Sequence, residues 1–343
     1  MKYSLLLTLS AFLMLWSCES QRSPESESID VQLIRGDAQG TTYSIKYTGE
    51  EQVEKAQIDS ILDQIDLSMS AWVDKSVLSE FNREDSIAIT DDHFLTVFFR
   101  GKEIHDLTDG AFHPMIMPLV KAWGFGPEGG ELPEGVHLDS LKRLVNYNFE
   151  IKPDDNADRI IFIKKAGHQL DVNGIAQGYS VDVVSTFLER EGVTNYMVEI
   201  GGELMARGKN EKDEYWRIGV DKPSSTAENR QLEAIVTLED AALATSGSYR
   251  KFYEKDGRKY SHTIDPFTGE PVNHNLLSAT VMASNSTNAD AFATAFMVYG
   301  LDGTKEFLAD HPEMNLEVFL IYDENGEVKT YASEGFNGVI ENL

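Results

Sequence analysis

Cysteine and basic residues are both scarce in this sequence. The 343-residue chain has one cysteine, so no disulfide within the chain can stabilise the fold. Lysine and arginine total 30 against 57 aspartates and glutamates, which gives a formal net charge of −27. This charge would repel nucleic acid and argues against binding through counterion release. It also makes a divalent cation a more necessary mediator for any phosphate-bearing ligand.

Long apolar runs are also rare, and the clearest one lies at the N-terminus. Lys2 precedes a run from Leu5 to Leu15 that is too short to span a membrane, which predicts an export signal over residues 1–17. The run ends in Leu15-Trp16-Ser17-Cys18, which resembles a bacterial lipobox, although Trp is less usual than a small residue at its position. We expect Cys18 to be lipidated and to anchor the protein. The alternative is a buried free thiol at the end of a signal peptide.

The rest of the chain divides into a tether and a folded body. Residues 18–30 are rich in Ser and Glu and nearly lack apolar side chains, which predicts a flexible acidic tether. Residues 31–343 are long enough to bury a sizeable core. We expect one large α+β domain of two packed lobes, with mixed or antiparallel sheets flanked by helices.

Apolar spacing predicts where the helices and strands of this domain lie. Alternation predicts strands from Val31 and over 43–47, with a loop over 36–42 between them. Helical spacing predicts helices over 77–82, 92–107 and 138–147, and a turn at 108–114 leading into an extended segment through Met117. Further strands are expected over 160–164, 196–200, 216–220, 232–238, 259–264, 278–283 and 318–322.

The stretch around Asp290 offers two hard oxygen ligands. Ala289, Phe292 and Phe296 have helical spacing, and Gly300 is expected to stop the helix. Asp290 in the first turn and Thr294 four residues later would share one face, and magnesium suits so sparse a pair because substrate phosphates complete its shell. The alternative is an Asp that stabilises the helix dipole and a Thr that bonds back to its own turn.

Two other segments carry groups suited to phosphoryl transfer. Residues 245–250, Thr-Ser-Gly-Ser-Tyr-Arg, combine hydroxyls, a glycine and an arginine that can hold phosphate oxygens, or they form a polar hairpin turn. Residues 261–266, Ser-His-Thr-Ile-Asp-Pro, place His262 where it can take a proton from an attacking hydroxyl. Asp265 would then orient His262 or shape the following turn, and either residue could be purely structural.

A third segment, residues 170–179, predicts a strand that ends at Asp171 and a glycine-containing turn that opens into a helix through Leu188. Such a junction presents backbone groups to a ligand, but its Gly174-x-x-x-Gly178 spacing matches neither common nucleotide-binding fingerprint. Gly201-Gly202 marks another tight corner.

Taken in chain order, these motifs resemble the ApbE family of bacterial flavin transferases, over roughly residues 36–331. The residues that carry the resemblance are Met69-Ser70-Ala71-Trp72, Ser79-Glu80-Phe81-Asn82, Thr108-Asp109-Gly110-Ala111, Trp123-Gly124-Phe125-Gly126, Asp171 to Tyr179, Gly201-Gly202, Thr245 to Arg250, Ser261 to Pro266, and Ala289 to Thr294.

The resemblance implies an ApbE-like, T-fold-like domain that cleaves FAD and transfers FMN to a Thr or Ser hydroxyl of an acceptor protein, with release of AMP. It implies magnesium at Asp290 and Thr294, with backbone oxygens of Gly174 and Ala293. It implies FAD contacts at Gln39, Trp72, Ala111, Phe112, His113, Asp171, Gln177 and Ile264, and catalysis at His262 and Asp265. Relatives commonly carry Met where Gln39 stands, and some carry an acidic residue at the His113 position.

The resemblance also implies a location and partners. We expect an exported protein, lipid-anchored to a bacterial membrane and facing the periplasm, whose acceptor is a subunit of a membrane electron-transfer complex. The alternatives are an FAD pyrophosphatase that yields FMN and AMP, a non-catalytic flavin-binding lipoprotein, and a structural surface lipoprotein.

Overall fold

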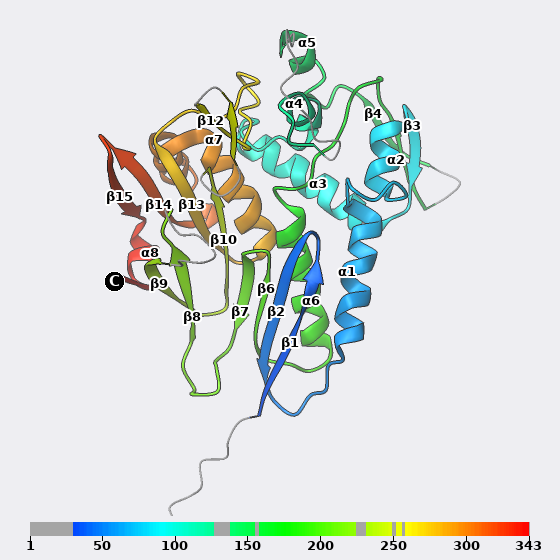
Figure 1. Ribbon diagram of the computed structural model, residues 1–343. Coiled ribbons are helices and arrows are strands. Elements are labelled where there is room, and N and C mark those ends of the chain that lie inside the picture. The colour runs from blue at the N-terminus through cyan, green and yellow to red at the C-terminus, as the bar shows by residue number, and fades with distance from the viewer. Residues whose placement is uncertain are drawn as a thin grey trace, which may run out of the picture.

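An eight-stranded antiparallel sheet with the order β1-β2-β6-β7-β10-β13-β14-β15 forms the centre of the molecule (Figure 1). The computed structural model describes residues 30–126, 138–154, 158–223, 231–248, 252–255 and 258–342. The strands of the sheet are β1 Val31–Ala38, β2 Thr41–Thr48, β6 Asn195–Ile200, β7 Glu203–Arg207, β10 Ala241–Gly247, β13 Leu276–Ala283, β14 Glu317–Glu324 and β15 Glu327–Ala332.

Three smaller sheets and a set of helices surround it. The other strands are β3 Ser86–Ile89, β4 Glu150–Pro153, β5 Ile160–Ile163, β8 Trp216–Asp221, β9 Leu232–Leu238, β11 Phe252–Lys255, β12 Arg258–Ser261 and β16 Ile340–Asn342. The helices are α1 Lys55–Met69, α2 Val77–Arg83, α3 Asp92–Leu107, α4 Met117–Ala122, α5 Leu138–Lys142, α6 Ala176–Arg190, α7 Ser286–Asp310 and α8 Glu334–Asn337, with 3-10 turns at Pro114–Ile116 and Pro312–Met314.

Alternating side chains bury the central sheet on both faces. On β7, Met205 belongs to the main core with α6 and α7, whereas Leu204 and Ala206 belong to a second cluster beneath β8 and β9. Phe292 of α7 is fully buried in the main core. The central sheet therefore lies between helices on one face and the β16-β9-β8 sheet on the other. The predicted α+β class with antiparallel sheets flanked by helices is confirmed.

A second group of elements, α2, α3 and the β3-β5-β4 sheet, packs around aromatic rings (Figure 1). Phe81, Phe98 and Phe162 are buried, and the rings of Phe98 and Phe162 meet edge-on with centroids 4.9 Å apart. Edge-on aromatic pairs add to the stability that buried area provides. Helical spacing predicts the helices of this part well, because α3 spans the residues expected of it.

The first hairpin corrects the expected loop over residues 36–42. β1 continues through Gly36 to Ala38, and the turn consists only of Gln39 and Gly40, at φ 53° and 71°. Positive φ at both central residues makes a two-residue turn whose twist matches that of the strands. Position 36 of this strand requires glycine, because a Cβ there would lie 2.5 Å from the ring of Tyr43, which passes beneath it.

Three other expectations about elements were wrong. The segment after His113 is not extended, because Pro114 and Pro118 occupy first-turn positions that favour the 3-10 turn and α4. The predicted helix over 138–147 ends at Lys142. Gly300, at φ 71°, interrupts α7 without ending it.

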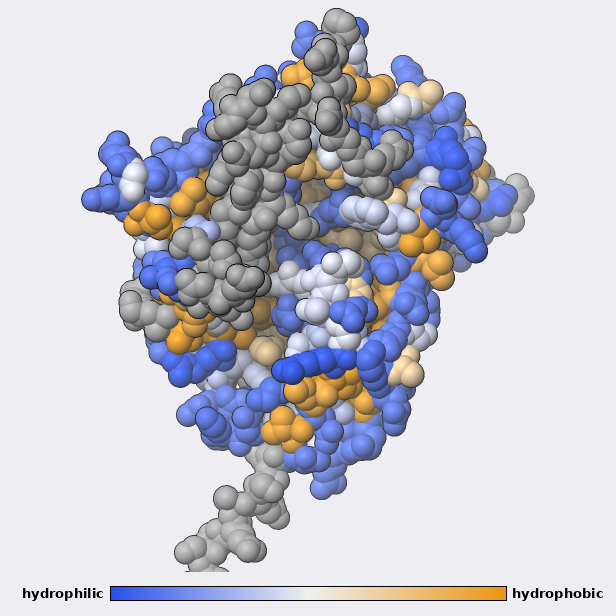
Figure 2. Space-filling view, viewed as in Figure 1, coloured by the Kyte–Doolittle hydropathy of each residue, from blue (hydrophilic) through white to orange (hydrophobic). Residues whose placement is uncertain are grey.

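The termini and the surface bear on the remaining predictions. Residues 1–29, and with them Cys18 and nearly all of the expected tether, lie outside the described residues. Within the part of the chain that the structure describes, no helix is both long and apolar enough to cross a membrane. Figure 2 shows a largely hydrophilic face with separate hydrophobic patches, as the excess of acidic residues leads one to expect.

The crossing of α6 and α7 leaves no room for a side chain at Gly178. We expect Gly178→Ala to lower the free energy of unfolding by about 1–3 kcal/mol, because the new Cβ would lie 2.3 Å from the Ser286 carbonyl oxygen. Urea denaturation measures this change, with Thr186→Ala on the exposed side of α6 as the control. Equal stability of the two variants would contradict the close packing.

Candidate functional site

A buried carboxylate lies where α6 and α7 cross. Asp290 of α7 is 4% exposed, and its Oδ2 accepts a hydrogen bond of 3.0 Å from the backbone N–H of Gly178. Gly178 lies in the first turn of α6, so the positive end of α6 faces this carboxylate. Asp290 is the fifth residue of α7, which corrects the expectation that the first turn of its own helix holds it.

The charge of Asp290 is poorly compensated within the protein. Burial raises its pKa well above the usual value, the nearby Glu203 and Asp182 raise it further, and only the Gly178 N–H bond acts in the opposite direction. Glu203 is 8% exposed and follows the Gly201-Gly202 corner. A divalent cation would offset this concentration of buried negative charge.

A carboxylate from α6 holds the start of α7. Asp182 accepts hydrogen bonds from the backbone N–H groups of Ser286 and Thr287, both at 2.8 Å, and from the Thr287 hydroxyl. It therefore caps the helix that carries Asp290, and fixes α7 against α6. The sequence patterns do not single out Asp182, although it lies four positions after Gly178 and thus on the same helical face.

A hydroxyl pair and a glycine complete the cluster. Thr294 Oγ1 lies 3.3 Å from Ser246 Oγ at the end of β10, so its bond crosses to another element instead of returning to its own turn. A Cβ placed on Gly174 would lie 2.9 Å from Thr294 Oγ1, which shows how closely that backbone approaches. Gly174, Ser246, Asp290 and Thr294 thus meet from three separate segments, the loop before α6, strand β10 and helix α7.

This cluster fits a magnesium ion. Its carboxylate, hydroxyl and backbone oxygens are hard ligands, and a set of few protein ligands leaves positions for water and substrate phosphates. Within the described residues, no group of three or more His, Cys, Asp or Glu side chains is arranged to hold a metal ion. Ala293 lies beside these ligands on α7 with its side chain in the core.

Two of the expected flavin contacts lie beside this cluster. Gln39 donates a 2.6 Å hydrogen bond from Nε2 to Ser180 Oγ on α6, and its buried Oε1 has no protein partner among the described residues. Gln177 packs against the glycine corner, since a Cβ on Gly201 would lie 2.4 Å from its Nε2. Both amides therefore stand at the first turns of α6.

Ala111, Phe112 and His113 form a buried corner on the other side. Phe112 Cε2 lies 3.3 Å from the position of a Cβ on Gly174, so its ring adjoins the cluster. His105 and His113 meet edge-on at 4.2 Å between ring centroids. Burial, with a smaller contribution from His105, lowers the pKa of His113 to about 3, and its ring is neutral at physiological pH.

Asp171 and Trp72 lie in segments outside the helices and strands. Asp171 follows no strand, as β5 ends at Ile163, and its backbone N–H donates to the Pro114 carbonyl at 2.7 Å. Its carboxylate accepts the Asn173 N–H at 2.8 Å, and burial raises its pKa. Trp72 lies on the loop after α1 and is 60% exposed, so its ring remains open to a ligand.

The carboxylate of Asp265 takes part in the turn after β12. Its carboxylate accepts the backbone N–H of Phe267 at 2.8 Å and of Thr268 at 3.4 Å, which supports the alternative that it shapes the turn. Ile264 is buried against the cluster formed by Met117, Leu119 and Val120. His262 directly follows β12 and is half-buried. Tyr249 and Arg250 lie outside the described residues.

The chain is similar to known proteins over most of its length. Residues 39–320 match the model of the ApbE family. An FAD:protein FMN transferase from Vibrio cholerae is 33% identical, with 96% of this chain and 97% of that protein covered, and one from Escherichia coli is 30% identical, with 97% and 96% covered.

Solved structures show the same likeness. The flavin transferase ApbE from Vibrio cholerae superimposes with a TM-score of 0.79 at 33% identity, covering 91% of this chain and 99% of that one. The apo form of the flavinyl transferase ApbE from Pseudomonas stutzeri superimposes with a TM-score of 0.78 at 32% identity, covering 91% and 97%. The chain therefore belongs to the ApbE family.

Proposed function

We propose that this protein transfers FMN from FAD to a Ser or Thr hydroxyl of an acceptor protein, with magnesium bound at the crossing of α6 and α7. The observation that carries the proposal is the meeting of Gly174, Asp290 and Thr294 at the first turn of α6. A buried carboxylate with nearby acidic groups, a hydroxyl and a closely approaching backbone favour a cation and the phosphates that accompany it.

The reaction exchanges the phosphoanhydride bond of FAD for a phosphoester bond to the acceptor. The acceptor hydroxyl oxygen bonds to the FMN phosphorus, the pyrophosphate bond of FAD breaks, and AMP leaves. His262 takes the proton of the acceptor hydroxyl, because a neutral imidazole is a base near physiological pH. When bound, magnesium supplies positive charge to the pyrophosphate oxygens.

The other residues bind and orient FAD. Gln39 and Gln177 present side-chain amides at the start of α6, and the unpaired Oε1 of Gln39 can accept one further hydrogen bond. Phe112 and the neutral His113 form an uncharged wall beside the cluster, and Trp72 offers an open aromatic face on which a flavin or adenine ring can stack. Asp171 and Ile264 hold the backbone of the surrounding loops.

The protein acts at a membrane surface in this proposal. The Lys2 to Leu15 segment directs export, and lipid on Cys18 anchors the domain through residues 19–30. The acceptor is then a protein of the same membrane, such as a subunit of an electron-transfer complex.

Removal of the proposed base tests the catalytic assignment. We expect His262→Ala to abolish transfer, seen as loss of the FMN mass gain on the acceptor, while FAD still binds by flavin fluorescence. His311→Ala, at the end of α7 and distant in sequence, is the control and should transfer normally. Normal transfer by His262→Ala would remove this residue from the mechanism.

The metal site has its own test. We expect Asp290→Asn to raise the magnesium concentration for half-maximal activity by at least about tenfold, because the ligand loses its charge. Thermal stabilisation by magnesium should shift in parallel, which measures binding without turnover. Asp302→Asn, exposed on the same helix, is the matched control, and an unchanged magnesium response of Asp290→Asn would refute the site.

Membrane anchoring depends on one side chain. We expect Cys18→Ser to move the exported protein from the membrane pellet to the soluble fraction, because the chain then lacks the acyl groups that hold it. Cell fractionation measures the change, and Ser20→Ala in the tether should remain in the pellet. A Cys18→Ser protein that stays in the pellet would contradict lipidation at this residue.

A further inference from the structure

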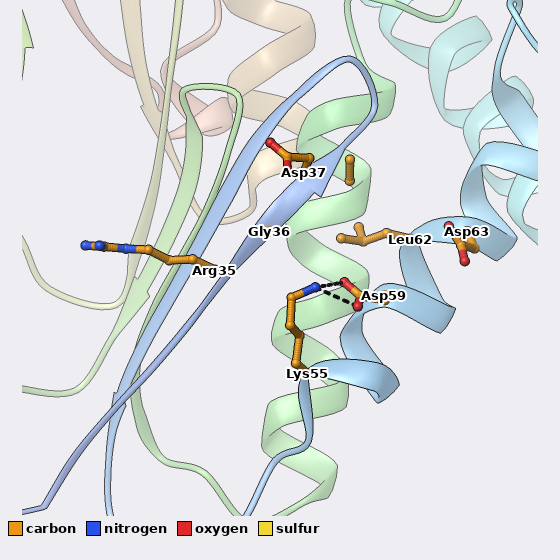
Figure 3. A pocket seen from close by; sticks show the side chains of 8 residues that line it. Arg35, Gly36, Asp37, Lys55, Asp59, Leu62 and Asp63 are labelled. Carbon is orange, nitrogen blue, oxygen red and sulfur yellow. Dashed lines mark hydrogen bonds and ion pairs between the residues drawn. The ribbon is translucent and has the colours of Figure 1, made fainter.

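A groove of about 500 Å³ lies between strand β1 and helix α1, apart from the cluster at Asp290 (Figure 3). Its lining is mostly charged, whereas small-molecule sites are lined mainly by apolar side chains. The residues that line it are Arg35, Gly36, Asp37, Ala38, Lys55, Asp59, Leu62 and Asp63.

Strand β1 presents unused backbone groups to this groove. It is an edge strand whose only ladder partner among the described strands is β2. Ala38 closes the two-residue turn opposite Thr41, so Ala38, Gly36 and Ile34 bond to β2, and the N–H and C=O groups of Arg35 and Asp37 point outward. No other backbone bond among the described residues uses the groups of these two residues.

A hydrogen-bonded group of three side chains lies on the α1 side of the groove. Tyr43 donates from its hydroxyl to Asp59 Oδ1 at 2.6 Å, and Lys55 Nζ lies 2.7 and 2.6 Å from the two oxygens of the same carboxylate. Figure 3 shows the Lys55 and Asp59 contacts on α1, with the Arg35 side chain pointing away from that helix. The absence of a side chain at Gly36 lets the Tyr43 ring extend below the strand to this pair.

Strand β1, which lines the groove, ends in a turn that contacts α6. Gln39 begins the turn at the end of β1 and bonds to Ser180, two residues after the Gly178 N–H that holds Asp290. From Arg35 to Gln39 is roughly 13 Å of extended chain. A segment paired with β1 would therefore end beside the first turn of α6.

We propose that an extended segment of the acceptor protein adds to the free edge of β1 and lies in this groove, which directs its hydroxyl toward the catalytic cluster. This inference rests on the proposed transfer of FMN to a protein. Backbone hydrogen bonds to Arg35 and Asp37 provide affinity without fixing the sequence. Three carboxylates and two cations line the groove, so a segment with a basic side chain complements it.

Kinetics with backbone variants of the full-length protein test the docking. The probe is the membrane protein of the native host that gains covalent flavin fluorescence on incubation with this chain, FAD and magnesium. Arg35→Pro removes one outward N–H without breaking the β1-β2 ladder, so we expect the KM for the acceptor to rise about tenfold. Arg35→Ala keeps the N–H and is the matched control, with a KM close to that of the unmodified protein.

A second pair of variants leaves β1 intact. Asp63→Trp should fill the groove from α1 and raise the acceptor KM, whereas Gln64→Trp, exposed on the same helix but absent from the lining, should not. Flavin fluorescence measures the FAD affinity of all four variants, which should stay unchanged. An unchanged affinity shows that the variants are folded.

The outcomes separate this inference from the proposed function. A protein without transfer activity under any condition would refute the function itself. In a second outcome, the unmodified protein transfers FMN normally while the acceptor KM is equal within each pair of variants, Arg35→Pro with Arg35→Ala and Asp63→Trp with Gln64→Trp. That result would overturn only the proposed docking in the groove. In a third outcome, sedimentation shows a dimer that Arg35→Pro dissociates without changing the acceptor KM. That result would assign the edge of β1 to a second copy of this chain and would overturn the proposed docking of the acceptor.

Discussion

The close contact between α6 and α7 is the constraint on which the site depends. The backbone of Gly178 comes so near to Ser286 and Asp290 that only glycine fits, and this proximity lets its N–H reach a buried carboxylate. Asp182 fixes the same two helices one turn further along by capping α7. One face of α6 thus supplies both the space and the hydrogen bonds that position Asp290.

The electrostatics of the crossing explain why such a site would hold a cation. Burial of Asp290 near Glu203 and Asp182 raises its pKa, so the protein alone disfavours the charged form that a metal needs. The first turn of α6 provides partial compensation through one N–H bond. A divalent ion bound there would provide the remainder, so that its binding and the ionisation of the carboxylate would favour one another.

Sequence patterns predicted the parts of the fold and the site that depend on local chemistry. Helical spacing identified α3 at its observed bounds, and Asp290 and Thr294 do lie together on one face of α7. The patterns failed where a distant contact decides the outcome. Gly36 was expected in a loop because the ring of Tyr43 beneath it is not visible in the sequence. Asp182 was not singled out because its hydrogen-bond partners are more than a hundred positions away.

The first hairpin connects the two surfaces that the reaction needs. Gln39 adopts a left-handed conformation that costs a non-glycine residue roughly 1–2 kcal/mol. In this conformation its side-chain amide forms a hydrogen bond to Ser180 of α6. The same two-residue turn fixes the register of β1, because side chains and backbone groups alternate along a strand. A turn longer by one residue would slip the register and direct the backbone groups of Arg35 and Asp37 toward β2. The turn that places an amide at α6 therefore also determines which groups the edge of β1 presents to a partner.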